Sequence, residues 1–272
     1  PNTIKEIGEY AFSDCVNLKS INLPDSLQSI GTYAFSDCQN LNSLFIGENI
    51  EKINGSMFHN CTKLELSISV NNKKYYCDNG LIFDSNTKEL IYVNSSIETE
   101  LIIPSDTTII GSCAASGKKF KKITFLSNTN LSEIGDAAFK SCDLLESVEV
   151  PESVISIGGY AFGDCLNLKQ VKLPKKLKYI QFYLFVNCKR LMKVDIGDSV
   201  KQIAFYAFSG CSSLTSINLP DSLTEIMQGA FEGCSSLCEV VIPSSVERIY
   251  DSAFEGCSSL ESIIIPDKIS VI

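Results

Sequence analysis

The stretch from Ile203 to Pro220 reads I-A-F-Y-A-F-S-G-C-S-S-L-T-S-I-N-L-P. Moved by 23 residues along the chain, the pattern returns from Ile226 to Pro243 and from Ile249 to Pro266. Moved the other way, it returns from Ile180 to Gly197 and from Ile157 to Pro174. A period of this length is typical of a solenoid, in which each repeat packs on its neighbours. The periodicity therefore outweighs the length of 272 residues, which alone would allow one or two domains.

The segment L-x-x-I-x-L-P of each repeat has the pattern of a short strand. Ile217 and Leu219 alternate with polar residues, so we expect one buried face. Proline then ends the strand, because it has no N–H to donate to a ladder. Since every repeat runs in the same direction, these strands must form a parallel sheet. The S-L/V-x-x-I-G segment that follows is too short for an ordinary helix, and it predicts a second short strand or an extended turn on the opposite side.

Two further positions recur once per repeat, one usually a phenylalanine and the other usually a cysteine, and we call them the aromatic column and the thiol column. We expect both to fill the space between the layers. Buried free cysteine behaves as a small hydrophobe, so we predict reduced packing thiols rather than disulfides. The redox state of Cys77, Cys113 and Cys238, which lie off the column, stays open. The aromatic column comprises Phe12, Phe35, Phe58, Phe139, Phe162, Phe185, Phe208, Phe231 and Phe254. The thiol column comprises Cys15, Cys38, Cys61, Cys142, Cys165, Cys188, Cys211, Cys234 and Cys257.

The full repeat, L-x-x-I-x-L-P-x-S-V-x-x-I-G-x-x-A-F-x-x-C, resembles that of the BspA-like leucine-rich repeat proteins over nearly the whole chain. The resemblance implies a leucine-rich-repeat solenoid with a parallel concave sheet and short second strands or turns on the convex side. It also implies a surface or secreted protein of a host-associated bacterium or a parasitic protist. In that family, such proteins are associated with adhesion to host or matrix proteins and to other microbes.

We expect a single solenoid over residues 1–272, taken from a longer protein, because the chain opens and closes within a repeat. Residues 1–66 hold repeats, 67–100 a β-hairpin insertion, 101–130 a degenerate repeat, and 131–272 regular repeats. The turn signal Asp78-Asn79-Gly80 between apolar runs predicts the hairpin. The alternative is a longer repeat with an elaborated edge.

The degenerate repeat departs from the pattern at three columns. Thr107 stands in place of Leu or Val, Ala115 in place of Phe, and Lys118 in place of Cys. One extra residue also separates Phe125 from Ile134. We therefore expect a packing defect or a compensating bulge, with the fastest hydrogen exchange of the array at residues 112–119.

Composition and motifs argue against several classes of function. The net charge of −9 argues against a nucleic-acid partner. No apolar run reaches the roughly 18 residues of a membrane helix, so we expect no direct membrane insertion. His59, the only histidine, is expected to be an exposed turn residue, and no nucleophile has a base beside it. We therefore expect neither an enzyme, nor a cofactor, nor a metal, with a calcium site at turn carboxylates such as Asp14 as the alternative.

The positions that flank the buried residue of each strand point outward, and they differ from repeat to repeat. With strands about 4.8 Å apart, this face would extend on the order of 50 Å, which is wide enough for a protein partner. We predict that it binds a host matrix or surface protein and that the chain is a monomer. The candidate binding residues on this face are Phe45, Glu149, Lys172, Lys193, Asp195, Val241 and Ile264.

Two other functions stay open at this point. The array would be a spacer or stalk if it only displays another domain. Carbohydrate binding would need exposed aromatic platforms, for which Phe45, Tyr75 and Tyr76 are the candidates.

Overall fold

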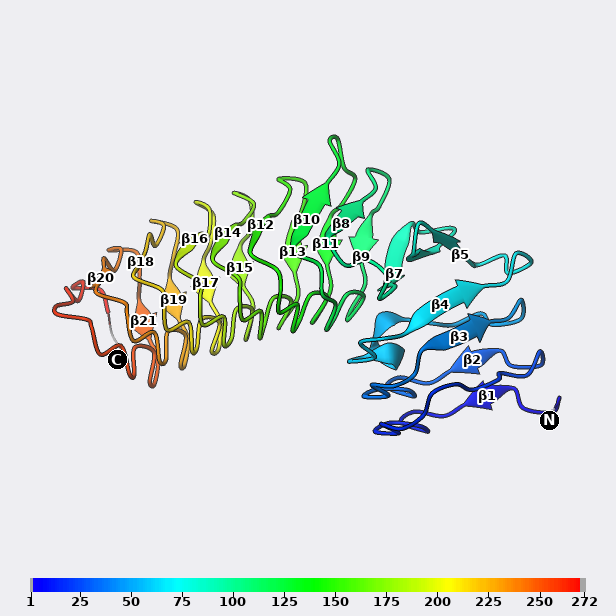
Figure 1. The fold of residues 1–272 in the computed structure, drawn as a ribbon. Coiled ribbons are helices and arrows are strands. Elements are labelled where there is room, and N and C mark those ends of the chain that lie inside the picture. The colour runs from blue at the N-terminus through cyan, green and yellow to red at the C-terminus, as the bar shows by residue number, and fades with distance from the viewer. Residues whose placement is uncertain (1, 270–272) are drawn as a thin grey trace.

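The computed structural model describes residues 2–269 and shows a long, bent solenoid with the two ends of the chain at opposite ends of the array (Figure 1). The predicted solenoid is confirmed, because strands of successive turns pair in parallel. Val148, Val171 and Val194 are register partners on three neighbouring strands, each 23 residues from the next. One turn of the chain therefore corresponds to one sequence repeat.

One strand from each turn builds the main layer. In β12, Val148 is buried while Ser147 and Glu149 are exposed, which is the alternation that the sequence predicts. Five of these strands form one parallel sheet in the order β16-β14-β12-β10-β8, and β3-β4 and β18-β20 form separate pairs. The strands of this layer are β3 (Ser43–Ile46), β4 (Glu65–Ile68), β8 (Glu100–Ile103), β10 (Lys122–Phe125), β12 (Ser147–Glu149), β14 (Gln170–Lys172), β16 (Lys193–Asp195), β18 (Ser216–Ile217) and β20 (Glu239–Val240).

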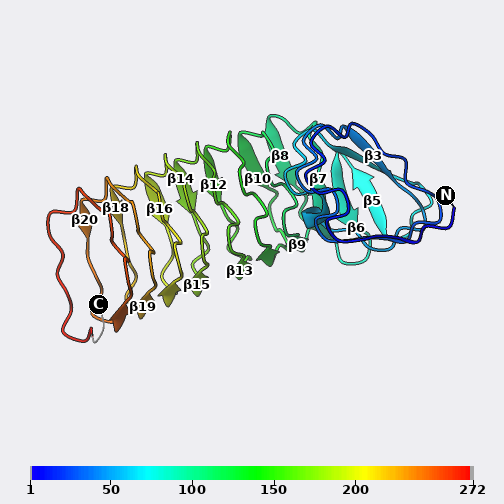
Figure 2. The same cartoon turned by 90° about the horizontal axis from the view of Figure 1, so that it is seen from below.

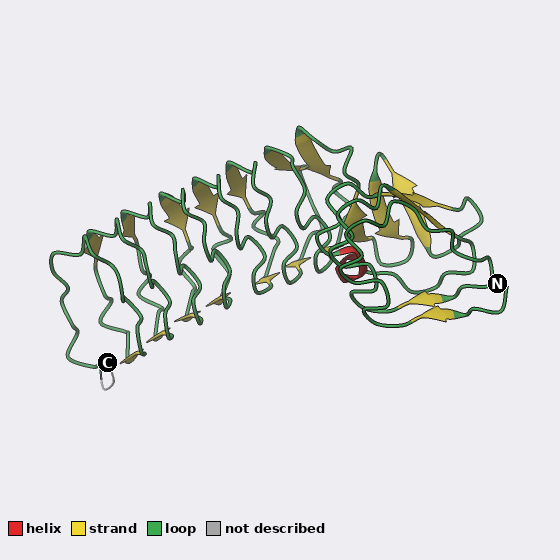
Figure 3. Ribbon diagram, turned by 60° about the horizontal axis from the view of Figure 1, so that its bottom comes forward, coloured by secondary structure: helices red, strands yellow, loops and turns green. Residues whose placement is uncertain are grey.

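The predicted second strand is also present, and it lies on the opposite side of each turn (Figures 2 and 3). These strands are two residues long, and β15-β17-β19-β21 form one parallel sheet. Each ends at an isoleucine, which is buried from β2 onward, as in β17 with Ile203. The members of this layer are β1 (Glu6–Ile7), β2 (Ser29–Ile30), β9 (Ile109–Ile110), β11 (Glu133–Ile134), β13 (Ser156–Ile157), β15 (Tyr179–Ile180), β17 (Gln202–Ile203), β19 (Glu225–Ile226) and β21 (Arg248–Ile249).

The aromatic and thiol columns pack between the layers as predicted, except that Cys15 in the first turn is exposed. Phe208 stacks between Phe185 and Phe231, with ring centroids 5.3 Å apart on both sides. The Cys211 thiol donates a hydrogen bond to the Phe185 carbonyl at 3.1 Å, and the same bond recurs along the column. All cysteines in the described part of the chain are free. Burial raises the pKa of the Cys165 thiol to about 12, so these thiols are neutral packing groups.

Residues 75–93 form three antiparallel strands, which we call the septum. They are β5 (Tyr75–Asp78), β6 (Leu81–Asp84) and β7 (Glu89–Val93). The septum is not a protrusion, because β7 also pairs in parallel with β9 and so continues the second layer. All of β6 is buried: Leu81 and Phe83 pack against the core that follows in sequence, whereas Ile82 packs against the core that precedes. The septum therefore separates two hydrophobic cores.

The solenoid bends where the septum lies, and we call this bend the elbow (Figure 1). On the turn side the two arms touch directly: a Cβ on Gly55, the first residue of the 3-10 helix η1 (Gly55–Phe58), would lie 2.5 Å from the Ser112 carbonyl. On the sheet side, no ladder within residues 2–269 joins β4 to β8, and the septum lies between them. The arms are therefore close on one side and apart on the other.

The degenerate repeat is packed more tightly than the sequence led us to expect. Cys113 to Lys118 are buried, and the amides of Cys113, Ala115 and Gly117 donate to the next turn. The register compensates for the irregular spacing, since Phe125 pairs with Ile103 over 22 residues and Ile134 with Ile110 over 24. A defect remains at Thr107, whose hydroxyl is buried without a hydrogen-bond partner.

Candidate protein-binding surface

The candidate residues at the centre of the main sheet lie in two parallel rows. Glu149, Lys172 and Asp195 are register partners on β12, β14 and β16 and form one row. Ser147, Gln170 and Lys193 form the other row in the same way. Because the valine between the two rows is buried on each strand, both rows face outward. The fold thus brings Glu149, Lys172, Lys193 and Asp195 together, as the sequence predicts.

The first row alternates in charge, and two of its three groups pair with each other. The Lys172 ammonium donates a hydrogen bond to the Glu149 carboxylate, and this bond raises the pKa of Lys172. The Asp195 carboxylate instead accepts from the Gly197 amide at 3.1 Å. Since these side chains are exposed, their pairing fixes orientation more than it stabilises the fold.

The apolar candidates are exposed but distant from that centre. Phe45 is 56% exposed and lies on β3, beyond the septum. Val241 follows β20 and Ile264 follows 23 residues later, with exposures of 71% and 83%. Ile102 on β8, which is not among the predicted candidates, is 49% exposed at a corresponding outward position. The seven candidates therefore lie at three places along one layer.

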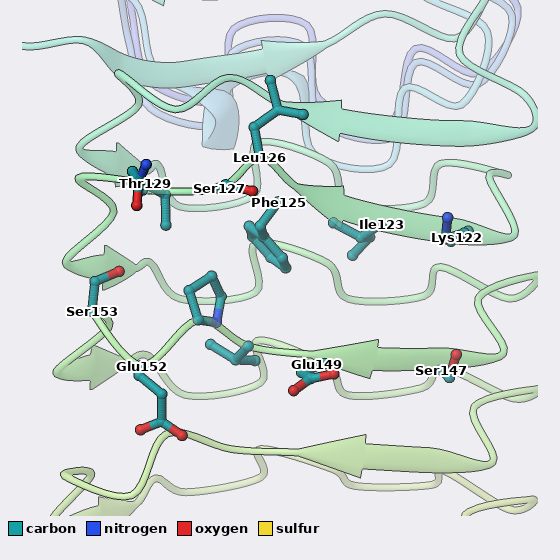
Figure 4. Close-up of a pocket in the computed structure, with 13 residues that line it drawn as sticks. Lys122, Ile123, Phe125, Leu126, Ser127, Thr129, Ser147, Glu149, Glu152 and Ser153 are labelled. Atoms are coloured by element: carbon teal, nitrogen blue, oxygen red, sulfur yellow. The ribbon is translucent and has the colours of Figure 1, made fainter.

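A depression of about 650 Å³ lies between β10 and β12, next to the charged row (Figure 4). Lys122 and Phe125 line it from β10, and Ser147 and Glu149 line it from β12. Glu152, in the turn after β12, also lines it. This mixture of charged, hydroxyl and aromatic groups is open to solvent and suits the side chain of a protein partner better than an enclosed small molecule.

Lys118 is buried at the elbow and connects the two arms. Its ammonium donates to the Cys61 carbonyl at 3.1 Å, the Tyr92 hydroxyl at 2.7 Å and the Ser95 hydroxyl at 3.1 Å. Removal from water lowers the pKa of Lys118 to about 8. The sequence showed Lys118 as a mismatch in the thiol column, but it gave no sign of Tyr92 as its partner.

A second group of side chains, which we call the turn-side cluster, lies on the inner side of the elbow. It surrounds a depression of about 430 Å³ that Tyr33 and His59 line from one arm, and Lys140, Tyr160 and Phe182 from the other. The Lys140 ammonium lies 4.9 Å from the centre of the Tyr160 ring. The sequence carries a signal for this cluster, since a tyrosine precedes Ala-Phe or Leu-Phe in several repeats.

Two expectations about single residues are wrong. His59 is half-buried rather than exposed, with its ring edge-on to Tyr33 at 6.2 Å, and burial lowers its pKa. Tyr75 is 3% exposed, because it belongs to the septum and its hydroxyl donates to the Glu51 carbonyl at 3.2 Å. Tyr75 therefore offers no aromatic platform.

The described residues contain no group of three or more His, Cys, Asp or Glu side chains that could hold a metal ion. The same part of the chain contains no helix of the length and hydropathy needed to span a bilayer. The fold and the exposed sheet instead define a leucine-rich repeat array, a class that generally acts as non-catalytic binding modules with extended surfaces.

Comparison with known proteins identifies the branch of this class. A family model described as "BspA type Leucine rich repeat region (6 copies)" matches residues 1–100, 88–211 and 183–272, so the chain belongs to that family. A leucine-rich repeat protein from Eubacterium ventriosum is 28% identical, with a TM-score of 0.88 over 99% of this chain and 72% of that one. One from Bacteroides ovatus is 28% identical, with a TM-score of 0.57 over 98% and 72%. No curated protein sequence matches the chain.

Proposed function

We propose that this array is the protein-binding part of a cell-surface or secreted protein and that it adheres to a host matrix protein or a microbial protein. The observation that carries the proposal is the row of Glu149, Lys172 and Asp195, which three parallel strands hold in register on an exposed face. Alternating charges of this kind favour a partner with the complementary pattern and disfavour others.

The remaining candidates extend the proposed surface along the same layer. Lys193 adds a positive charge beside the row. Phe45, Val241 and Ile264 are exposed apolar side chains towards the two ends. Binding would then be spread over many contacts, with the centre of the sheet deciding which partner is accepted.

Charge reversal at the centre tests this location. We expect the double variant Lys172→Glu/Lys193→Glu to bind its partner at least 10-fold more weakly, about 1.4 kcal/mol, because it makes the row wholly acidic. Binding would be measured by surface plasmon resonance against a panel of purified extracellular-matrix proteins. The melting temperature should not change, since both side chains are on the surface.

The matched control is Lys175→Glu/Lys176→Glu, which alters the net charge equally in an exposed turn after β14. An equal loss of affinity in both double variants would show that only net charge matters and would refute the proposed surface. Unchanged affinity in the first variant would refute it as well. If the array bound no panel protein while longer forms of the protein did, a spacer function would replace adhesion.

A further inference from the structure

The main sheet is interrupted inside the molecule, and the interruption leaves two strand edges facing the elbow. The five-stranded sheet ends at β8, whose only ladder within residues 2–269 is with β10. In that part of the chain β4, which precedes it in the main layer, pairs only with β3. In a regular array the backbone groups of these two edges would form hydrogen bonds with each other, so each edge needs a substitute partner here.

The edge of β4 has such a substitute. The Asn94 side-chain amide donates to the Leu66 carbonyl at 3.0 Å and accepts from the Leu66 N–H at 2.8 Å. The Ser96 amide also donates to the Glu65 carboxylate at 2.6 Å. Asn94 therefore imitates the backbone of a neighbouring strand and closes this edge.

The edge of β8 has no equivalent. The Ile103 carbonyl accepts from Leu126 N–H at 3.2 Å, so the backbone of Ile103 faces β10. Because successive residues of a strand direct their backbone groups to opposite sides, Ile102 faces the open edge. Among the described residues, none forms a backbone hydrogen bond with Ile102 across that edge. Such an edge is a template for an added strand.

A mainly apolar depression of about 450 Å³ lies alongside this edge. Leu81 and Ile97 line it from the septum side, and Ile102 lines it from β8. Leu126, which follows β10, contributes a side chain that is 44% exposed. Open backbone groups and a pocket for a side chain are the two features that strand-addition sites combine.

The charges around the depression are mainly acidic. Asp78 and Glu100 are the charged residues that line it, and Glu100 on β8 is paired with Lys122 at 2.8 Å. Since that pair is neutral overall, the exposed Asp78 leaves a negative charge at the rim. A segment with a basic side chain complements it.

We propose that the β8 edge binds an extended basic segment of a partner protein by strand addition. The segment would run about four residues along β8, place an apolar side chain in the depression, and bring a basic side chain near Asp78. This site uses backbone groups at the elbow, so it goes beyond the proposed function of the sheet face and does not depend on it.

The test uses a peptide that copies residues 121–126, acetyl-Lys-Lys-Ile-Thr-Phe-Leu-amide, because β8 already accepts this segment on its other side. We expect the fluorescently labelled peptide to bind the unmodified chain, measured by anisotropy. A version N-methylated at alternate residues should not bind, since it cannot form the ladder. Ile102→Pro should weaken binding at least 10-fold, because it removes the N–H at the open edge while leaving the β10 side intact.

Side-chain variants test the depression in case proline disturbs the fold. Leu126→Lys should weaken binding at least 5-fold, whereas Leu166→Lys, at a leucine that is 42% exposed outside the depression, should leave it unchanged. The amide of Ile102 should exchange more slowly when peptide is bound to the unmodified chain. Lys172→Glu/Lys193→Glu should bind the peptide normally, which separates this site from the sheet face.

Several outcomes would overturn the inference. They are no binding of the unmodified peptide, equal binding of the N-methylated one, and equal weakening by Leu126→Lys and Leu166→Lys. A dimer in sedimentation that Ile102→Pro dissolves would assign the edge to a second copy of the chain instead of a partner protein.

Discussion

The regular arm and the elbow solve the same packing problem with different chemistry. In the regular arm, a neutral thiol such as Cys211 reaches back to the Phe185 carbonyl of the preceding turn. At the elbow, the ammonium of Lys118 reaches back to the Cys61 carbonyl, and it also binds Tyr92 of the septum. The thiol closes a gap between adjacent turns, whereas the longer lysine side chain connects turns between which the septum has been inserted.

This difference gives the two regions opposite responses to pH. Burial keeps protons on the thiols of the regular arm, because it raises their pKa. The same physical effect removes a proton from Lys118 more easily, because it lowers the pKa of that ammonium to about 8. Alkaline conditions should therefore weaken the regular arm and favour the folded state of the elbow.

The largest expected effect is loss of the regular arm above pH 9. Cys142, Cys165, Cys188 and Cys211 are fully buried with raised pKa values, while unfolded thiols ionise near 9.0. Above pH 9 the folded state then binds more protons than the unfolded state, so stability falls as the pH rises; for Cys165 the fall continues to its folded pKa of about 12. Each thiol contributes about 1.4 kcal/mol per pH unit, or about 6 kcal/mol per pH unit for the four. Urea unfolding followed by circular dichroism under reducing conditions would measure this fall.

The matched test removes two of the thiols. Above pH 9, the free energy of unfolding of the Cys165→Ala/Cys188→Ala variant should fall by about 3 kcal/mol less per pH unit than that of the unmodified chain. Parallel pH profiles for the two proteins would contradict the role of the thiol column.

A smaller difference in stability is expected between a phenylalanine stacked on two sides and one with a single edge-on contact. Phe208→Ala should lower the free energy of unfolding by about 3–5 kcal/mol, because a large buried ring is lost. Phe120→Ala should cost about 0.5–1.5 kcal/mol less, since Phe120 has one edge-on contact, with Phe139 at 6.4 Å, instead of two stacked neighbours. Equal losses in chemical denaturation would show that the stack itself adds nothing.

The pH response of Lys118 is a third test of the difference. The unfolded lysine keeps its proton up to its usual pKa of 10.5, whereas the folded one loses it near 8. The unfolded state therefore binds more protons between pH 8 and 10.5, and stability from this group rises across that window. The stability of the unmodified chain relative to Lys118→Met should increase by about 1.4 kcal/mol per pH unit above 8. The exposed Lys122→Met serves as control, and its profile should parallel that of the unmodified chain.

The smallest expected effect concerns the remaining defect near the elbow. Thr107→Val should stabilise the protein by about 1 kcal/mol, because it removes a buried hydroxyl that has no partner while keeping the shape. Thr108→Val should give no gain, since the Thr108 hydroxyl already donates to the Thr87 carbonyl at 2.5 Å. A loss of stability in Thr107→Val would indicate a bridging water at this hydroxyl.

The sequence predicts the regular arm well, because each turn depends only on residues within one period. The alternation around Val148 identifies the strand, and the recurrence of Cys211 and Phe208 identifies the buried columns. The charged row follows from the same periodicity, since positions 23 residues apart become neighbours.

The elbow could not be predicted because its contacts do not follow the 23-residue period. Gly55 and Ser112 are 57 residues apart, as are Cys61 and Lys118. The inserted segment sets that spacing, and a local sequence pattern does not reveal which turns meet after an insertion. The apolar run Leu81-Ile82-Phe83 indicated a strand, but only the structure shows that its two faces serve different cores. The turn-side cluster was missed for a related reason, because Tyr33 and Tyr160 come from different arms and line one depression only because of the bend.

The septum has a consequence for how such a protein can change in length during evolution. Each face of the septum packs against a different hydrophobic core. The packing of one arm therefore does not depend on the number of turns in the other. Duplication or deletion of a 23-residue unit in one arm would leave the geometry of the bend unaltered. The length of the solenoid and the angle of its bend can thus change independently. The number of 23-residue units sets the length, and the single inserted segment sets the angle.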